Sequence, residues 1–279
     1  MALSIHTNYS SLITQTNLSK TNNALGTNQQ RLGTGLRINS AADDAAGLQI
    51  ATRLNAQSRG MEVAMRNTGD AVSLLQTAEG AFNEMTDIMQ RMKDLATQAA
   101  NDTNSTDDRT ALQAEYDELG NELTNIITNT KYAGEALFAA AGKFTAAMTF
   151  QIGASSAETL SLDASGELTD VTDAITTIKA EVLTDATTSG SAMDELETAL
   201  NAVGTMRAQF GANINRLNHT SNNLANMKDN TEMSKGRILD ADFAKESANM
   251  SKNSMLMQSG ISMLKQAGQM PGMVMSLLG

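Results

Sequence analysis

The side chains that could carry out chemistry are few and lie far apart in this sequence. The chain has two histidines, His6 and His219, and no cysteine. Neither histidine has neighbours at metal-ligand spacing, so we interpret both as ordinary polar positions. The motifs of a zinc-protease helix, a nucleophile elbow and a phosphate-binding loop are missing, and the glycines of RLGTGLRIN follow no strand pattern. The sequence therefore predicts that the protein is not an enzyme and needs neither a metal nor a cofactor.

The most conspicuous carboxylates are adjacent in the chain, at Asp43 and Asp44. Neighbouring residues on a helix point about 100° apart, so these two groups cannot clamp one substrate. We expect a structural role instead, either as negative charge at the start of a helix or in ion pairs with Arg31, Arg37 or a neighbouring subunit. These four residues are therefore candidates for a subunit interface.

Charge is unevenly distributed along the chain. The net charge of −11 comes from residues 61–227, because each end of the chain has slightly more basic than acidic side chains. An acidic middle segment favours solubility and disfavours binding to nucleic acid. The N-terminus has neither the basic nor the apolar part of a signal peptide, and no apolar run is long enough for a membrane helix. We expect a protein without a cleaved leader that does not enter a membrane, and the lack of cysteine suits an oxidising exterior.

Apolar periodicity predicts long helices that must position any functional side chain. Between residues 71 and 99, apolar side chains recur in steps of three and four. A second row beside them contains Leu74, Ala81, Ile88 and Leu95. Two adjoining rows make a stripe wider than a two-stranded coiled coil needs, so we expect a bundle of at least three helices. The composition agrees, because it contains 18 methionines and only 3% aromatic residues.

The next segments predict a second helix and a hairpin. Ser105 or Thr106 can cap a helix whose apolar residues extend to Thr130. After it, apolar and smaller or polar residues alternate from Phe144 to Ile152, which is typical of a half-buried strand. Residues 159–163 supply a partner strand, so we expect a β-hairpin within residues 143–165.

A long returning helix is expected near the C-terminal side of the chain. We interpret ATTSGS at 186–191 as a loop and place the helix start near Ala192, with Ser191 as its cap. Polar Asn213 and Thr220 occupy its apolar seam, either because a hydrated seam tolerates them or because they specify its register. In the last helix, Pro271 is expected to cause an end or a kink.

The two ends of the chain have matching apolar patterns, so we expect them to pair. The N-terminal stripe is thin and alone would be marginally stable or disordered. The C-terminal segment is apolar on two faces and needs a packing partner. The core of the predicted terminal coiled coil consists of Leu18, Leu25, Leu32, Phe243, Met250, Met257, Ile261 and Leu264.

Several segments resemble bacterial flagellins, and they occur in the family's order. The N-terminal half contributes TGLRINSAADDAAGLQIATRL (34–54) and EGAFNEMTDIMQRMKDLATQAAN (79–101). The remainder contributes QIGASSAETLSLD (151–163), FGANINRLNHTSNNLAN (210–226), GRILDADFAKESANMSK (236–252) and the ending LKQAGQMPGMVMSLLG. The resemblance covers most of the chain.

The resemblance implies a mainly α fold, a coiled-coil bundle of long helices with a small β-hairpin and paired ends. The inner domain of flagellins, D0, would comprise residues 1–42 and 236–279. The next domain, D1, would comprise residues 43–178, with its N-terminal helices and hairpin, and its C-terminal helix at 179–235. The short segment between the hairpin and the returning helix leaves no room for the outer domains D2 and D3.

The resemblance also implies a function and partners. A flagellin polymerises with its own copies into the extracellular filament used for swimming. It is exported unfolded by the flagellar type III apparatus, with an export chaperone on its C-terminal segment. Filament-cap and hook-junction proteins would be further partners. The alternative is a hook–filament junction protein, which shares the terminal helices.

One segment resembles a receptor site. QRMKDLATQ is similar to the site through which animal Toll-like receptor 5 senses flagellin. Carried over by position, Gln90, Arg91, Leu95 and Glu115 would form this face. Arg91 and Leu95 are four residues apart and are expected to share one side of a helix. The alternative is that these residues serve protofilament packing alone.

Overall fold

The computed structural model describes residues 7–278, which divide into two compact units. One unit combines the N-terminal segment up to residue 57 with the segment from residue 230 onward, and the other contains residues 58–229. The helices are α1 (Tyr9–Thr34), α2 (Ala45–Ala99), α3 (Thr106–Asn129), α4 (Ser165–Ala180), α5 (Ala186–Leu239) and α6 (Phe243–Leu278). The strands are β1 (Lys131–Tyr132), β2 (Glu135–Ala136), β3 (Met148–Gln151) and β4 (Thr159–Leu162), with a 3-10 turn, η1, at Lys143–Thr145.

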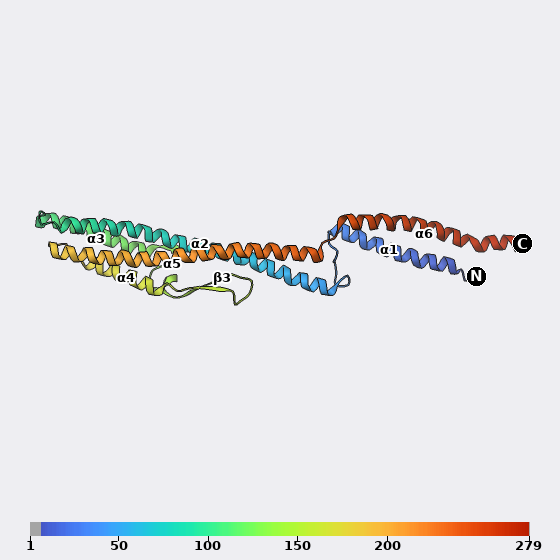
Figure 1. The fold of residues 1–279 in the computed structure, drawn as a ribbon, viewed down its shortest axis with the longest axis horizontal. Coiled ribbons are helices and arrows are strands. Elements are labelled where there is room, and N and C mark those ends of the chain that lie inside the picture. The colour runs from blue at the N-terminus through green and yellow to red at the C-terminus, as the bar shows by residue number, and fades with distance from the viewer. Residues whose placement is uncertain (1–6, 279) are drawn as a thin grey trace. The chain divides into compact units, whose positions relative to one another are not determined.

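The first unit is built on the pairing of α1 with α6. The two helices lie side by side, and their outer ends are the two ends of the chain (Figure 1). They are antiparallel, because Arg31 contacts Glu246 near one end of the pair and Asn8 contacts Ala267 at the other. The expected pairing of the terminal segments is therefore confirmed.

A glycine turn leads out of α1 and holds the inner end of this pair. Gly35 adopts φ +72°, a left-handed conformation that glycine tolerates best, and its N–H donates to the Arg31 carbonyl. Beyond the turn, the Arg37 N–H donates to the Leu239 carbonyl at 2.6 Å, and the Ala241 N–H donates to the Gly35 carbonyl at 2.9 Å. Backbone hydrogen bonds therefore fix the two chain segments to each other at this end.

The second unit is a helical bundle with a core of slim apolar side chains. α2, α3, α4 and α5 run alongside one another in it (Figure 1). The expected stripe on α2 is confirmed as the centre of this core, since its members are at most 2% exposed: Ala71, Leu75, Ala78, Phe82, Met85, Met89, Met92, Ala96 and Ala99. Four phenylalanine rings meet in the core, and the centroid of Phe82 lies 4.8 Å from that of Phe138.

Helix α4 was not expected from the sequence. Its buried residues Leu168, Val171, Ile175 and Ile178 follow the helical spacing of three and four. Four threonines stand among the other positions of this helix, and threonine has a low helix propensity. Packing against α3 therefore decides the conformation of this segment more than local preference does.

Two small antiparallel hairpins accompany the bundle. The expected hairpin is confirmed as β3 paired with β4, with Met148 opposite Leu162 and Gln151 opposite Thr159. The β1–β2 hairpin was not expected. Its two-residue turn uses Ala133 at φ 51° and Gly134 at φ 86°, both positive as in the tight turns that suit a strand pair.

The structure corrects the expected start of the returning helix. α5 begins at Ala186, so residues 186–191 are helical rather than a loop, and Ser191 is not the cap. Asp185 has this role, because its Oδ1 accepts from the N–H groups of Thr187 and Thr188 at 2.8 and 2.9 Å. By contrast, the expected cap of α3 is confirmed: Ser105 forms a reciprocal capping box with Asp108.

The structure also bears on the expectations about polar residues in α5 and about proline in α6. Asn213 donates to the carbonyl of Gln209 and Thr220 donates to that of Arg216, so both bond within α5, which favours local tolerance over register specification. At Pro271, the expected alternative of a helix end is wrong, because α6 continues to Leu278, and the alternative of a kink stays a prediction.

Candidate functional site

An ion pair joins α2 to α3 on the surface of the second unit. Nε and Nη2 of Arg91 lie 3.0 and 2.6 Å from the same carboxylate oxygen of Glu115. The two side chains are 55% and 47% exposed. Gln90 beside them is also exposed. The structure thus pairs Arg91 with Glu115 in a polar patch accessible from solvent, and Gln90, a third residue expected there, is exposed next to Arg91 in the chain.

Leu95 does not belong to this exposed patch. It is 1% exposed and lies in the core of the bundle, so Arg91 and Leu95 do not share one exposed side of α2. The sequence held a signal for this position, because Leu95 falls in the second apolar row with Leu74 and Ile88. Leu95 can therefore affect the exposed patch only indirectly, because its packing in the core positions the helical turn that carries Arg91.

The adjacent carboxylates serve the turn between α1 and α2. One oxygen of Asp43 accepts from the N–H groups of Asn39 and Ser40 at 3.1 and 2.9 Å, and from the Ser40 hydroxyl at 3.1 Å. The backbone N–H of Ser40, followed by that of Asn39, holds the pKa of Asp43 below its usual value. Asp44 caps α2 by accepting from the Gly47 N–H at 2.8 Å. Of the expected roles, helix-start charge is the one seen here.

Arg31 and Arg37 both contact the C-terminal segment within the first unit. Nη1 of Arg31 lies 3.2 Å from Oε1 of Glu246, which is 7% exposed. Nη2 of Arg37 donates to the Ile238 carbonyl at 2.8 Å. Sequence reasoning missed Glu246, although an acidic residue among the apolar positions of a terminal helix is a signal that could have pointed to it.

The residues expected in the terminal coiled-coil core divide into two groups. Phe243 and Ile261 are 61% and 42% exposed, so neither is buried by the pairing of α1 and α6. The others are half-buried: Leu18, Leu25, Leu32, Met250, Met257 and Leu264. This thin seam leaves much apolar surface uncovered in the single chain.

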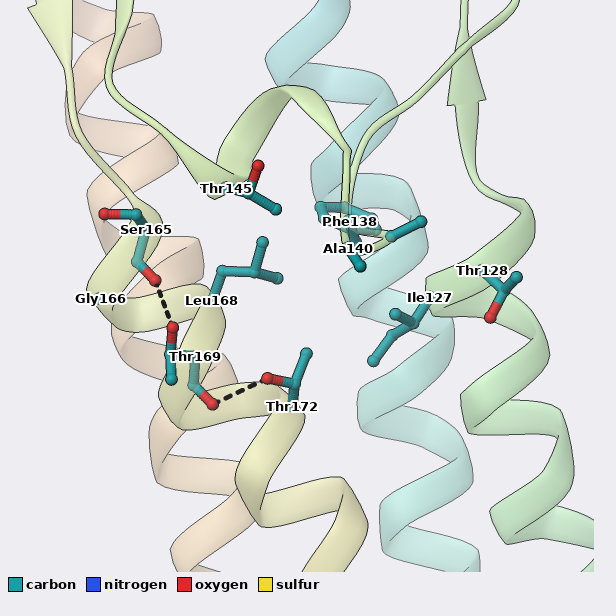
Figure 2. A pocket seen from close by; sticks show the side chains of 11 residues that line it. Ile127, Thr128, Phe138, Ala140, Thr145, Ser165, Gly166, Leu168, Thr169 and Thr172 are labelled. Carbon is teal, nitrogen blue, oxygen red and sulfur yellow. Dashed lines mark hydrogen bonds between the residues drawn. The ribbon is translucent and has the colours of Figure 1, made fainter.

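A pocket of about 610 Å³ opens between α3, α4 and the loop that contains η1. Figure 2 shows Leu168, Thr169 and Thr172 of α4 on one wall and Ile127 and Thr128 of α3 on another. The lining contains no charged side chain and no histidine. Its hydroxyls bond to nearby groups, as Thr169 does to the Ser165 carbonyl and Thr172 to that of Thr169. The side chains that line the pocket therefore include hydroxyls but no acid or base of the usual kinds.

The described residues hold no group of three or more histidine, cysteine, aspartate or glutamate side chains that could bind a metal ion. Over the same part of the chain, no helix has the length and hydropathy of a membrane span. His219 is exposed on α5, and His6 lies outside the described residues. The described side chains can therefore support packing between helices and binding through the protein surface.

Two family profiles match the chain. The profile described as the bacterial flagellin N-terminal helical region matches residues 5–143, and the one described as the bacterial flagellin C-terminal helical region matches residues 193–278. Together the two profiles cover the terminal helices α1 and α6 and most of the bundle. The segment between them contains the β3–β4 hairpin and α4.

Several known proteins are similar to this chain over much or all of its length. Flagellin A of Vibrio anguillarum is 35% identical over 381 aligned positions, covering 100% of both proteins. A flagellin of Halalkalibacterium halodurans is 40% identical over 249 residues, covering 89% of this chain and 90% of its own. The crystal structure of Bacillus cereus flagellin has 34% identity and a TM-score of 0.50, covering 57% of this chain and 88% of that one. Because the Vibrio alignment is longer than the 279 residues present here, that relative has segments without a counterpart in this chain.

Proposed function

This chain belongs to the bacterial flagellin family and is a short-form subunit of the motility filament, and on this basis we propose how it assembles. The proposal is that copies of the chain polymerise through the surface of the terminal helix pair, α1 and α6. Large apolar side chains on α1 and α6 stay exposed although the helices pair. Leu12 is 62% exposed, Phe243 61%, and Met255 and Met263 are each 64% exposed. An uncovered apolar surface of this kind marks a contact with another protein. This exposure is the observation that carries the proposal.

Lysine substitutions test the surface in the full-length protein. Met255→Lys with Met263→Lys should raise the critical concentration for seeded polymerisation at least about tenfold, because each methionine loses its burial against a neighbour. Val182→Lys is the matched control, since Val182 is 47% exposed but lies in the second unit. Deleting residues 240–279 should leave a soluble protein that does not polymerise. Normal filaments from either altered protein would overturn the proposal.

The same surface needs cover before assembly, which supports export with a chaperone. The chaperone would cover the C-terminal segment from Phe243 onward, and the flagellar type III apparatus would export the chain unfolded. A purified flagellar export chaperone should bind Val182→Lys normally and lose affinity for the double methionine variant. Equal binding to both would contradict this site. Hydrogen exchange should show weak protection of α1 and α6 in the monomer and strong protection in the filament.

The patch of Gln90, Arg91 and Glu115 is the proposed site for Toll-like receptor 5. Its support is the resemblance of this segment together with the exposure of both partners in the ion pair. A charged, geometrically defined pair can act as a recognition hot spot when a partner desolvates it. The resemblance also places protofilament packing at this patch, so receptor binding by monomers and assembly would compete for one surface.

A receptor-reporter assay with monomeric protein tests this site. Arg91→Ala should reduce the response at least about tenfold. Lys93→Ala is the matched control, because Lys93 lies on the same helix and pairs with Glu197 on α5 instead. No response to the unaltered monomer, or equal loss in both variants, would exclude the patch as the receptor site. Polymerisation of both variants should be measured in parallel, since packing alone would affect only that readout.

Filament-cap and hook-junction proteins would contact the ends of the polymer rather than a separate site on the chain. The hook–filament junction alternative is not favoured, because the two relatives described above are aligned over 90% and 100% of their own lengths and both are flagellins. Electron microscopy after seeding distinguishes the two, since a filament subunit forms long polymers and a junction protein does not.

A further inference from the structure

The side-chain amide of Asn8 links the first turn of α1 to α6. Its Oδ1 accepts from the Ser11 N–H at 3.0 Å and so caps α1. Its Nδ2 donates to the Ala267 carbonyl at 2.6 Å, across 259 residues of sequence. One amide therefore satisfies a free donor of its own helix and an acceptor of the partner helix.

The Ala267 carbonyl is available because of Pro271. In an α-helix, each carbonyl accepts from the N–H four residues later, and proline has no N–H. α6 nevertheless continues beyond Pro271 to Leu278. Pro271 is the only proline in the sequence, so it releases one particular carbonyl inside this helix. Ala267 is 8% exposed, and an unpaired carbonyl at such a position is costly.

The apolar contacts between α1 and α6 specify their alignment weakly. Leu18, Leu25 and Leu32 are only half-buried, and a thin seam of similar side chains allows neighbouring registers of similar energy. Polar contacts distinguish the registers better. Asn28, which is 7% exposed, is placed so that its amide can accept from the Met250 N–H at 3.2 Å while donating to the Ala24 carbonyl.

The Asn8 contact acts at the outer end of the pair, where the Nδ2 of Asn8 reaches the Ala267 carbonyl. Backbone hydrogen bonds around Gly35 and Ala241 hold the inner end, and the Arg31–Glu246 pair lies near it. If α6 shifted by one turn along α1, Asn8 would face a carbonyl that already has its helical partner. The Ala267 carbonyl would then lose its partner.

We propose that Asn8 and Pro271 form a register lock for the terminal helix pair. Pro271 releases one carbonyl, and Asn8 binds it. The lock sets which apolar side chains a subunit presents to its neighbours in the filament, so Asn8 is a positioning residue for assembly. The proposal rests on the filament function and is independent of the receptor and export proposals, because its test uses purified protein alone.

A double-mutant cycle in the full-length chain tests the lock. Asn8→Ser keeps a helix-capping oxygen but is too short to reach Ala267, so it should raise the critical concentration for seeded polymerisation about tenfold. Pro271→Ala restores the helical N–H to the Ala267 carbonyl. In that background, Asn8→Ser should change the critical concentration less than about twofold. An equal loss in both backgrounds would overturn the proposal.

A direct measure of register keeps the test decisive if Pro271→Ala itself impairs assembly. The chain has no cysteine, so a pair can be introduced as Leu18→Cys and Gly260→Cys, where a Cβ at position 260 would lie 3.2 Å from the Leu18 side chain. A second pair, Leu18→Cys with Leu264→Cys, reports a shift of one turn. Adding Asn8→Ser should move disulfide formation from the first pair toward the second. Asn8→Asp, which keeps the cap and removes the donor, should shift the ratio of the two disulfide products in the same direction as Asn8→Ser. An unchanged ratio would refute the register lock.

Discussion

Arg31 of α1 and Glu246 of α6 form an ion pair with Nη1 3.2 Å from Oε1, although 215 residues separate them in the sequence. Nε of Arg31 and Oε2 of Glu246 are buried and have no hydrogen-bond partner within the single chain. The ion pair is thus largely buried, and each of its two side chains has one polar atom without a hydrogen bond. Removing one member leaves the other charge in a poorly hydrated place.

Arg31→Met should destabilise the terminal helix pair by about 3 kcal/mol. This value is at the low end of the cost of breaking a buried ion pair, because the Arg31 side chain is 28% exposed. The lost Coulomb attraction leaves the Glu246 carboxylate uncompensated. The urea midpoint for filament dissociation measures the effect, since the pair is expected to be folded there.

The control for this substitution is Arg66→Ala. Arg66 and Glu62 form a pair of similar length, 3.3 Å, but their side chains are 63% and 50% exposed. Its loss should change the dissociation free energy by less than about 0.5 kcal/mol. Equal shifts for the two variants would mean that burial does not determine the contribution of the Arg31 pair.

Phe82→Ala should lower the free energy of unfolding of the second unit by about 3–5 kcal/mol. Phe82 is fully buried and contacts the rings of both Phe138 and Phe210, so truncation leaves a cavity at the centre of the bundle. Chemical unfolding of monomeric protein, followed by circular dichroism, measures the change. Val63→Ala, on the same helix but 45% exposed, should stay within about 0.5 kcal/mol, and similar losses in both would contradict the assigned core.

The sequence predicted the long helices well because their apolar spacing is regular over many turns. The α2 stripe and the Ser105 cap depend on residues within one helix or one turn, so local pattern determines them. α4 was missed because its propensity is weak and its four buried residues are stabilised by packing against other elements of the bundle, α3 among them. The start of α5 was misplaced because Asp185 caps a serine- and threonine-rich turn that resembles a loop.

The candidate site was less predictable because it depends on contacts between distant residues. The ion pair of Arg91 and Glu115 could be anticipated only through family resemblance, and the burial of Leu95 required weighing its apolar row against that resemblance. The hydrogen bond from Asn8 to the Ala267 carbonyl joins residues near opposite ends of the chain. No local pattern carries that information.

Stability of the second unit should fall in acid because of its capping carboxylates. Hydrogen bonds from Ser105 hold the pKa of Asp108 below its ordinary value of 3.8, and the Thr188 N–H does the same for Asp185. A lowered folded-state pKa means that the stabilisation is complete above 3.8 and is lost as pH falls through the folded-state value. The urea midpoint should therefore be flat above that range and decline below it.

Asparagine substitutions isolate this pH dependence. Asp108→Asn and Asp185→Asn keep an oxygen that can cap the helix but cannot titrate. The double variant should be less stable than the unaltered chain near neutral pH and should lose less stability on acidification. Parallel curves for the two proteins below pH 3.8 would show that other groups govern the acid response.

Tyr116→Phe should destabilise the second unit by about 1 kcal/mol, because the Tyr116 hydroxyl donates to the Ile178 carbonyl at 3.0 Å inside the α3–α4 interface. The ring stays the same size, so the loss reports the hydrogen bond rather than a cavity, and the Ile178 carbonyl keeps the Glu181 N–H as its remaining donor at 3.4 Å. Tyr132→Phe is the control, since its hydroxyl contacts the Asp70 carbonyl at 3.3 Å near solvent and should contribute less than about 0.5 kcal/mol.

Burial, followed by the negative charges of Glu181 and Asp117, also raises the pKa of Tyr116. Ultraviolet titration of the unaltered chain should therefore retain one phenol that ionises only when the bundle unfolds, and this phenol should be missing from Tyr116→Phe but present in Tyr132→Phe.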